Sequence, residues 1–284
     1  MINIDLLIEK DTGQIKLSEY NLLVQDIEAS SPSMMVDRRT VKNRSGVINA
    51  GAQFVSKTIK VAGSFYASSL LDYENRVDEL NALLIDLDPY YITKMIPIND
   101  ELYQYQIPGE TTNDLNLLEI EHEPFKYRYK VQPDGDLNFQ FNGKSDKGLF
   151  FKFTFYFITA EMPFGETIPK TLSINSDSIS YDGTAKNSQL EYPWTIKLVA
   201  DTQQSGTFTL MIGSKTFSYS SQTDIQSGDI FLLKGIETTK NGTNVNNYTN
   251  REHFVLEPRL DKEIPVTTNF QGTIQILNFV EFYK

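Results

Sequence analysis

Two adjacent segments of the chain differ in the spacing of their hydrophobic residues. Over Thr58–Tyr66, apolar and polar residues alternate, which places Ile59, Val61 and Phe65 on one face of a strand. Over Leu70–Leu84, apolar residues instead recur three or four positions apart, as on the buried face of an amphipathic helix. The pattern predicts a strand that leads directly into a helix.

Signals at both ends support this helix. Ser69 can act as its N-cap, and Asp72 falls in the first turn, where a carboxylate interacts favourably with the helix dipole. Asp72 also lies four positions before Arg76, the favourable orientation for an ion pair on a helix. Because Pro89 disfavours helical backbone at Asp88, we expect the helix to end near that residue.

The most strand-prone segment of the chain is Leu149–Ile158, whose even spacing of phenylalanines predicts one buried face. The residues on that face are Phe151, Phe153, Phe155 and Phe157. The segment Met162–Pro169 follows, with two prolines, one glycine and no periodicity, which is typical of a domain boundary. We therefore expect an N-terminal β-rich domain with one helix over residues 1–163 and a second domain over 164–284.

The second domain contains only short strand patterns separated by turn signals, which favours a β-sandwich. The expected strands are Thr171–Ile174, Ser178–Tyr181, Tyr192–Ala200, Gly206–Ile212, Lys215–Ser220, Asp229–Lys234, His253–Leu256 and Thr273–Phe282. In the first domain, Asp134-Gly135 and Asn142-Gly143 are hairpin turn signals on either side of an alternating segment. The fold class predicted for the whole chain is mainly β.

A long polar stretch, Ala29–Gln53, carries four cations: Arg38, Arg39, Lys42 and Arg44. One interpretation is a solvated surface hairpin, because charged runs usually face water. The other is a subunit interface, because long loops in compact domains often serve binding. A basic arm on an acidic protein is suited to grip an acidic neighbour, including another copy of the same chain.

Three glutamates, Glu119, Glu121 and Glu123, alternate along Leu118–Glu123 and are expected to point to one side. Two carboxylates at such spacing can serve glycoside hydrolysis. Catalytic pairs commonly come from separate strands, so a solvated acidic stripe is the favoured interpretation.

The composition of the chain limits the kinds of binding and catalysis that it can support. The formal net charge of −11 argues against general nucleic-acid binding, which needs a basic surface. The chain has no cysteine and two histidines, His122 and His253, which leaves little for a metal site or a catalytic triad. We expect no enzyme activity, no cofactor and no metal. No basic leader and no apolar run of about 20 residues is present, so neither a signal peptide nor membrane insertion is expected.

The order of these parts resembles the distal tail protein of siphophages, long-tailed non-contractile bacteriophages that infect Gram-positive bacteria. The resemblance covers the whole chain and rests on architecture and order. Its most telling stretches are Ser64–Leu84, the aromatic strand ending at Pro163-Phe164, Gly228–Lys234, Asn241–Asn247, Leu256–Pro258 and Thr273–Phe282.

This resemblance implies a hub without catalytic function at the distal end of the virion tail, assembled in the host cytoplasm. The family implies a hexameric ring of N-terminal domains around an open channel, through which DNA passes without specific binding. In such a ring, Glu119, Glu121 and Glu123 are candidates for the lining of the channel. It implies a galectin-like C-terminal sandwich. The implied partners are the tail tube protein, the tail-associated lysin or tail-tip protein, the tape measure protein and receptor-binding proteins.

Two other functions compete with a hub. A carbohydrate- or receptor-binding module would need exposed aromatics, with Tyr181, Tyr219 and Tyr248 as candidates. Trp194, which follows a proline in a strand pattern, is more often a core residue. It is followed by Thr195-Ile196 and not by the Trp-Gly-x-Glu stretch of sugar-binding galectins, so a docking platform is favoured over a lectin. A cell-wall hydrolase is disfavoured because no triad or metal set is visible.

Overall fold

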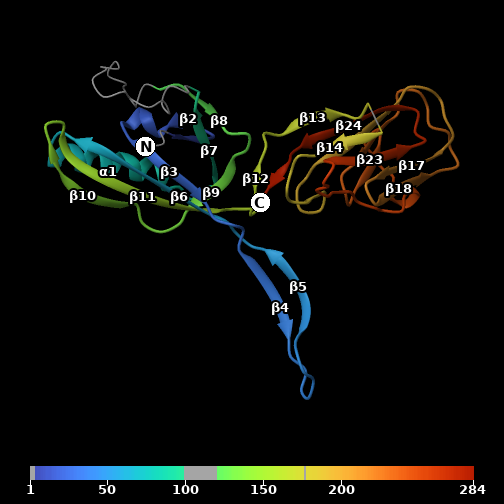
Figure 1. Cartoon of the computed structure of the whole chain (residues 1–284). Helices are drawn as coiled ribbons and strands as arrows, with labels where there is room; N and C mark the ends of the chain where they lie inside the picture. Colours follow the sequence, from blue (N-terminus) through green and yellow to red (C-terminus); the bar gives the residue numbers. More distant parts are fainter. Residues whose placement is uncertain (1–3, 99–119, 176) are drawn as a thin grey trace. The chain divides into compact units, whose positions relative to one another are not determined.

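The computed structural model describes residues 4–98, 120–175 and 177–284. The chain forms two compact units (Figure 1). Unit 1 runs through Gly165 and includes Lys284, and unit 2 is Glu166–Tyr283. Both units are built mainly from strands, which confirms the predicted fold class.

A nine-stranded sheet forms the framework of unit 1. Its main path is β2-β1-β7-β9-β11-β6-β3, with β10 also paired to β11 and β8 to β7. The strands are β1 (Asp5–Lys10), β2 (Gly13–Lys16), β3 (Leu23–Ala29), β6 (Thr58–Ala67), β7 (Tyr90–Pro97), β8 (His122–Pro124), β9 (Tyr129–Pro133), β10 (Asn138–Ser145) and β11 (Gly148–Thr159). A short 3-10 helix, η1 (Leu17–Tyr20), connects β2 to β3.

The central feature of this sheet is the antiparallel pairing of β6 with β11, from Leu149 opposite Ala67 to Ile158 opposite Thr58. The predicted face of β11 is buried: its four phenylalanines at positions 151, 153, 155 and 157 are at most 5% exposed. Gly63 lies opposite Phe153, and a side chain at position 63 would collide with that ring. The strand therefore has glycine where the phenylalanine needs the space.

Helix α1 (Leu70–Leu84) begins where the sequence predicts. Ser69 Oγ accepts a hydrogen bond from the backbone N–H of Asp72 at 3.1 Å, and Arg76 Nε lies 3.1 Å from the Asp72 carboxylate. The predicted cap and ion pair are thus confirmed. The inner face packs on the sheet, with the ring of Tyr73 stacked 4.2 Å from that of Phe151.

One predicted turn is wrong. Asn142-Gly143 lies within β10, where Phe141 pairs with Phe151 and Gly143 with Phe150, so Asn142 is the extra residue of a β-bulge. Pairing with β11 continues to Ser145, and the chain reverses only at residues 146 and 147. Continued pairing along β11 outweighs the local turn preference of Asn-Gly, and the positive φ of Gly143 suits the bulge.

Strands β4 (Met34–Arg39) and β5 (Ile48–Phe54) form a separate two-stranded ribbon, which we call the arm (Figure 1). In the described residues, these strands pair only with each other. The base of the arm is closed by hydrogen bonds, from Ser33 N–H to Ser56 O at 2.7 Å and from Val55 N–H to Ser33 O at 2.9 Å. A surface hairpin was one of the two interpretations of this polar stretch, although no alternation of apolar residues marked the positions of its strands.

Unit 2 contains two principal sheets (Figure 1). The six-stranded sheet has the order β13-β24-β16-β19-β20-β21, and the four-stranded sheet has the order β14-β23-β17-β18. Their strands are β13 (Lys170–Ser173), β14 (Ser178–Ser180), β16 (Thr195–Ala200), β17 (Thr207–Ile212), β18 (Lys215–Ser220), β19 (Ile230–Leu233), β20 (Thr238–Lys240), β21 (Thr243–Asn244), β23 (Glu263–Thr268) and β24 (Gly272–Phe279). Short elements complete the unit: β12 (Gly165–Glu166), β15 (Asn187–Ser188), β22 (Val255–Leu256), β25 (Phe282–Tyr283) and the 3-10 helix η3 (Asn246–Tyr248).

A single hydrophobic cluster joins the two sheets of unit 2. It includes Ile196 and Leu198 of one sheet and Phe208, Leu210 and Phe217 of the other, each at most 1% exposed. Alternating buried residues from both sheets are the arrangement expected of a sandwich. Each predicted segment of this half contains a strand, whereas β12, β15, β20, β21 and β23 were not predicted.

The Asp72 carboxylate stabilises the start of α1. The Ser68 backbone N–H donates to the Asp72 carboxylate and lowers the pKa of that carboxyl below 3.8, and Arg76 adds to this effect against the opposing effect of burial. A carboxyl with a lowered folded-state pKa stabilises the fold at neutral pH, and this stability is lost as the pH falls through 3.8 and then through the folded-state pKa. Asp72→Asn should therefore lower the free energy of unfolding by about 1 kcal/mol at pH 7.

Denaturant titrations of the wild type and Asp72→Asn between pH 7 and pH 3 measure this difference, which should shrink on acidification. The matched control is Asp78→Asn, since Asp78 is exposed on the same helix and has no ion pair among the described residues. A difference that persists unchanged at pH 3 would contradict the electrostatic explanation.

The arm should contribute little to the stability of the fold. Because the two strands are paired up to the base, residues 35–53 can be replaced by an Asn-Gly turn between Met34 and Phe54, which keeps the contact of Phe54 with Phe164. The free energy of unfolding should change by less than about 1 kcal/mol, since no large apolar surface is uncovered. Phe155→Ala is the positive control and should cost about 3–5 kcal/mol. A comparable loss on arm replacement would show that the arm stabilises the fold.

Candidate subunit interface

All four predicted interface cations lie on the arm, but not as one patch. Arg38 pairs with Asn49 and Arg39 with Ile48, so these neighbouring arginines point to opposite faces of the ribbon. Lys42 and Arg44 lie in the connecting turn, which the Arg44 N–H closes by donating to Val41 O at 3.1 Å. The cations therefore cover both faces and the tip.

Charge on the arm is mostly uncompensated. Arg39 lies 3.3 Å from Asp37, an exposed pair of little energetic value. Within the described part of the chain, the other three arm cations have no ion pair. Four cations less one carboxylate leave the arm with three net positive charges, on a chain whose formal charge is −11. The arm is thus an exposed basic element of an acidic protein.

The arm also exposes hydrophobic side chains that sequence reasoning missed. Met34 is 60% exposed, and it shares one face with Val36, Ala52 and Phe54, because Met34 pairs with Phe54 and Val36 with Ala52. Further exposed apolar residues are Met35, Val41, Val47, Ile48 and Val55. The run Met34-Met35-Val36 and the pair Val47-Ile48 were the available signals in a stretch otherwise dominated by polar residues.

An isolated two-stranded ribbon is marginally stable in water. Within the described residues, the contacts of the arm beyond its own pairing lie at its base, where the ring of Phe54 meets that of Phe164 at 5.7 Å. Exposed apolar side chains, unpaired cations and open strand edges together make a surface that another molecule can cover. The arm is therefore the candidate interface of unit 1.

Lys57 fixes the junction between the arm and the sheet. Its side chain is buried, which lowers the pKa of its ammonium group, and this group lies 5.3 Å from the ring centroid of Tyr129. Its backbone N–H donates to Thr159 Oγ1 at 2.9 Å. The chain is thus held tightly at the start of β6, immediately after the arm ends.

The predicted acidic stripe is only partly described. Glu119 lies outside the described residues. Glu121 and Glu123 are both exposed, and Glu123 stands in β8 opposite Ile96 of β7. The backbone carbonyl of Glu121 accepts from the Ile98 N–H at 3.1 Å, which holds this segment against β7. The assignment of these carboxylates to a channel stays a prediction.

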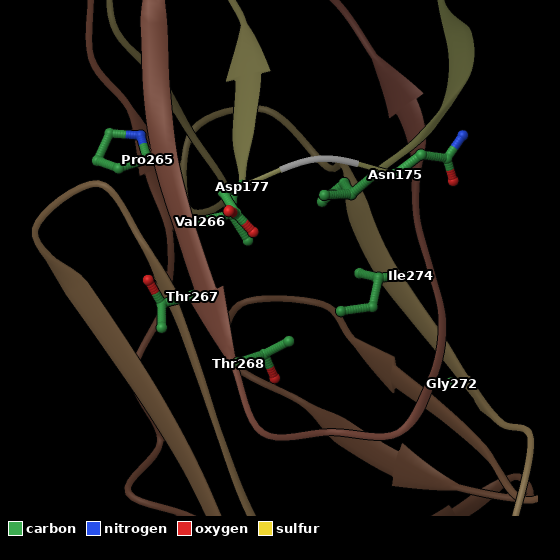
Figure 2. Close-up of a pocket in the computed structure, with 9 residues that line it drawn as sticks. Asn175, Asp177, Pro265, Val266, Thr267, Thr268, Gly272 and Ile274 are labelled. Atoms are coloured by element: carbon green, nitrogen blue, oxygen red, sulfur yellow. The ribbon is translucent and has the colours of Figure 1, made fainter.

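Unit 2 has a cavity of about 540 Å³ where the chain passes from β13 to β14 (Figure 2). The backbone oxygen of Asp177 accepts from Val266 N–H at 2.7 Å at its edge. The lining residues are Ile174, Asn175, Asp177, Pro265, Val266, Thr267, Thr268, Gly272 and Ile274, none of them aromatic. The cavity therefore lacks the stacking platform of a typical sugar site.

The aromatic candidates for sugar binding are mostly internal. Trp194 is 1% exposed, as its interpretation as a core residue predicts, and Tyr181 and Tyr219 are also buried. Tyr248, at 51%, is the exposed member of the three tyrosines. It is not among the cavity-lining residues, so the features of a glycan site are not brought together.

Other kinds of site find no support in the described residues. Among them, no three or more histidine, cysteine, aspartate or glutamate side chains are grouped so as to hold a metal ion. No helix in the same residues is sufficiently long and apolar to span a bilayer.

Comparison with solved structures places the fold. The chain is similar to the Dit protein of phage SPP1, described as a paradigm of the hub adsorption apparatus in phages that infect Gram-positive bacteria. The TM-score is 0.63 at 15% sequence identity, over 99% of both chains. A chain of the phage P2 baseplate in its activated conformation with calcium is matched over 99% of this chain and 98% of that one, at 9% identity. Its TM-score is 0.36, which carries no structural argument.

Sequence comparison identifies the family. No curated protein matches the chain by sequence. A family model for the phage tail protein RIFT-related domain matches residues 10–154, about half of the chain and within unit 1. The matched region includes the arm, α1 and most of β11. The chain thus belongs to the family of phage tail proteins that carry the RIFT-related domain.

Proposed function

We propose that this protein is the structural hub at the distal end of a siphophage tail. Six copies form a ring that joins the tail tube to the tail tip or baseplate and leaves a channel for DNA. The observation that carries the proposal is the arm: a basic, partly apolar ribbon whose exposed surface lacks a cover within the described chain. Membership of a phage tail family and the Dit-like fold support the same role.

The two units take different parts in this proposal. Unit 1 forms the ring, with Arg38, Arg39, Lys42 and Arg44 contacting the next copy head to tail, a contact that can close on itself. Glu119, Glu121 and Glu123 line the channel, where solvated carboxylates repel DNA. Unit 2 is the galectin-like sandwich and serves as a docking platform for baseplate or receptor-binding proteins.

The neighbours in the virion follow from this position. The tail tube protein contacts one side of the ring, and the tail-associated lysin or tip protein contacts the other. The tape measure protein ends near the channel. The protein itself is a structural component without catalytic function or cofactor, and it assembles in the host cytoplasm before it becomes part of the virion.

Negative-stain microscopy of the purified protein over a concentration series tests the ring directly. Closed rings with a central hole that become more abundant with concentration are the expected result. Monomers at all concentrations, together with binding to cell-wall glycan, would instead favour the carbohydrate-binding alternative.

Removal of the arm cations should weaken assembly. In Arg38→Ala/Arg39→Ala/Lys42→Ala/Arg44→Ala, the concentration at which half of the chains are assembled should rise about tenfold at 0.05 M salt. The difference from the wild type should narrow at about 1 M salt, where the Debye length is about 3 Å. Analytical ultracentrifugation measures both values. Normal assembly of this variant at low salt would remove the arm from the interface.

Reversal of the acidic stripe should affect DNA passage and not assembly. Glu119→Lys/Glu121→Lys/Glu123→Lys should form normal rings but slow DNA release from phage particles, because a basic lining attracts phosphate. Release kinetics measured by fluorescence of a DNA-binding dye are the readout. An unchanged release rate with intact rings would show that these residues do not line the channel.

A further inference from the structure

The outer face of helix α1 is a second surface of unit 1 that the described residues leave exposed. Leu71, Glu74, Asn75 and Asp78 follow one another at helical spacing on the side away from the sheet, and all four are exposed. Leu71 is 71% exposed and adds an apolar group at the start of this face. The face thus combines apolar surface at its start with carboxylates further along.

The charges on this face have no compensating ion pair among the described residues. Glu74 and Asp78 are four positions apart, a like-charge pair that destabilises an isolated helix. Glu79 adds a third exposed carboxylate beside them. In the described residues, none of the three has an ion pair, whereas Asp72, nearer the sheet, is paired with Arg76. A cationic partner on this face would therefore relieve repulsion.

We infer that this face of α1 is the surface on which the arm of a second copy of the chain docks. The inference rests on the proposed role of the arm and names its receptor. Three net positive charges on the arm meet three carboxylates on the helix, and neither surface is covered by the described residues of its own chain. Opposite charges brought together in this way determine register and partner choice.

The order of chemical groups matches along the two surfaces. From the base of the arm outward, one face presents Met34 and Val36, then Arg38, and the tip presents Lys42. Along the helix, Leu71 comes first and the carboxylates follow. Apolar contacts thus meet at one end and ion pairs form further along.

The length of the arm also agrees with the length of the helix. Six residues of β4 extend roughly 20 Å, at about 3.3 Å per residue. The 15 residues of α1 extend about 22 Å, at about 1.5 Å per residue. One arm can therefore lie along the length of one helix.

Charge reversal in two variants tests the contact. The arm variant is Arg38→Glu/Lys42→Glu, and the helix variant is Glu74→Lys/Asp78→Lys. Each alone should raise the half-assembly concentration about tenfold or more, because like charges then face each other. A mixture of the two should assemble again within about threefold of the wild type, since each arm finds a complementary helix on the other variant.

General attraction between the variants does not explain such a rescue. Their net charges are −11 − 4 = −15 for the arm variant and −11 + 4 = −7 for the helix variant, so both remain acidic. The matched control is Asp134→Lys/Asp136→Lys, which makes the same charge change at two exposed carboxylates between β9 and β10. It should assemble normally and should not rescue the arm variant.

The outcomes separate the inference from the proposed function. Failure of the arm variant with normal assembly of the helix variant would overturn docking on α1 and leave the role of the arm intact. Normal assembly of both variants would overturn docking on α1 and also the role of the arm in assembly. Mutual rescue in the mixture supports both.

A second measurement applies even where rings do not accumulate in solution. The chain has no cysteine, so Arg38→Cys/Glu74→Cys introduces the only two thiols. Mild oxidation should produce a ladder of disulfide-linked multimers, whereas Arg38→Cys/Asp136→Cys should not. Absence of the ladder from the first variant, or equal ladders from both, would overturn the inference.

Discussion

The pairing of β6 with β11 is the constraint on which the rest of unit 1 depends. Strand β6 begins directly after the arm and ends directly before α1, so its position determines where both interaction surfaces leave the sheet. Ten residue pairs hold it to β11, and the phenylalanines of β11 supply much of the core beneath α1. A change that shifted this register by one residue would turn those phenylalanines toward solvent.

The arm is held together by different interactions from those that hold the sheet. Burial of one face determines the strands around the core, whereas the arm is determined by its own cross-strand pairs and by the hydrogen bonds at its base. Its sequence accordingly combines surface charge with apolar residues, because it serves no core. The separation of a stable core from an exposed basic ribbon lets fold and association depend on different residues.

This difference explains which elements the sequence predicts. Alternation in β6 and β11 and helical spacing in α1 are visible because burial imposes a period, and the cap at Ser69 follows from local chemistry. The arm strands, exposed on both faces, show no such period. Strand β23 alternates buried Ile264 and Val266, but Pro265 argues against a strand in sequence-based reasoning. The cations of the arm were visible as residues, but their division between two faces and a tip required the register.

The same β6–β11 ladder has a consequence for biosynthesis. Each residue of β6 pairs with one made 82 to 100 positions later, from Ala67 with Leu149 to Thr58 with Ile158. At about 5–20 residues per second, β6 stays without this neighbour for roughly 4–20 seconds during translation. Such long-range pairing slows folding, and the phenylalanine-rich β11 is prone to aggregate until it finds its partner. Lys152, in the middle of that strand on its exposed face, interrupts the aromatic run and so acts against aggregation.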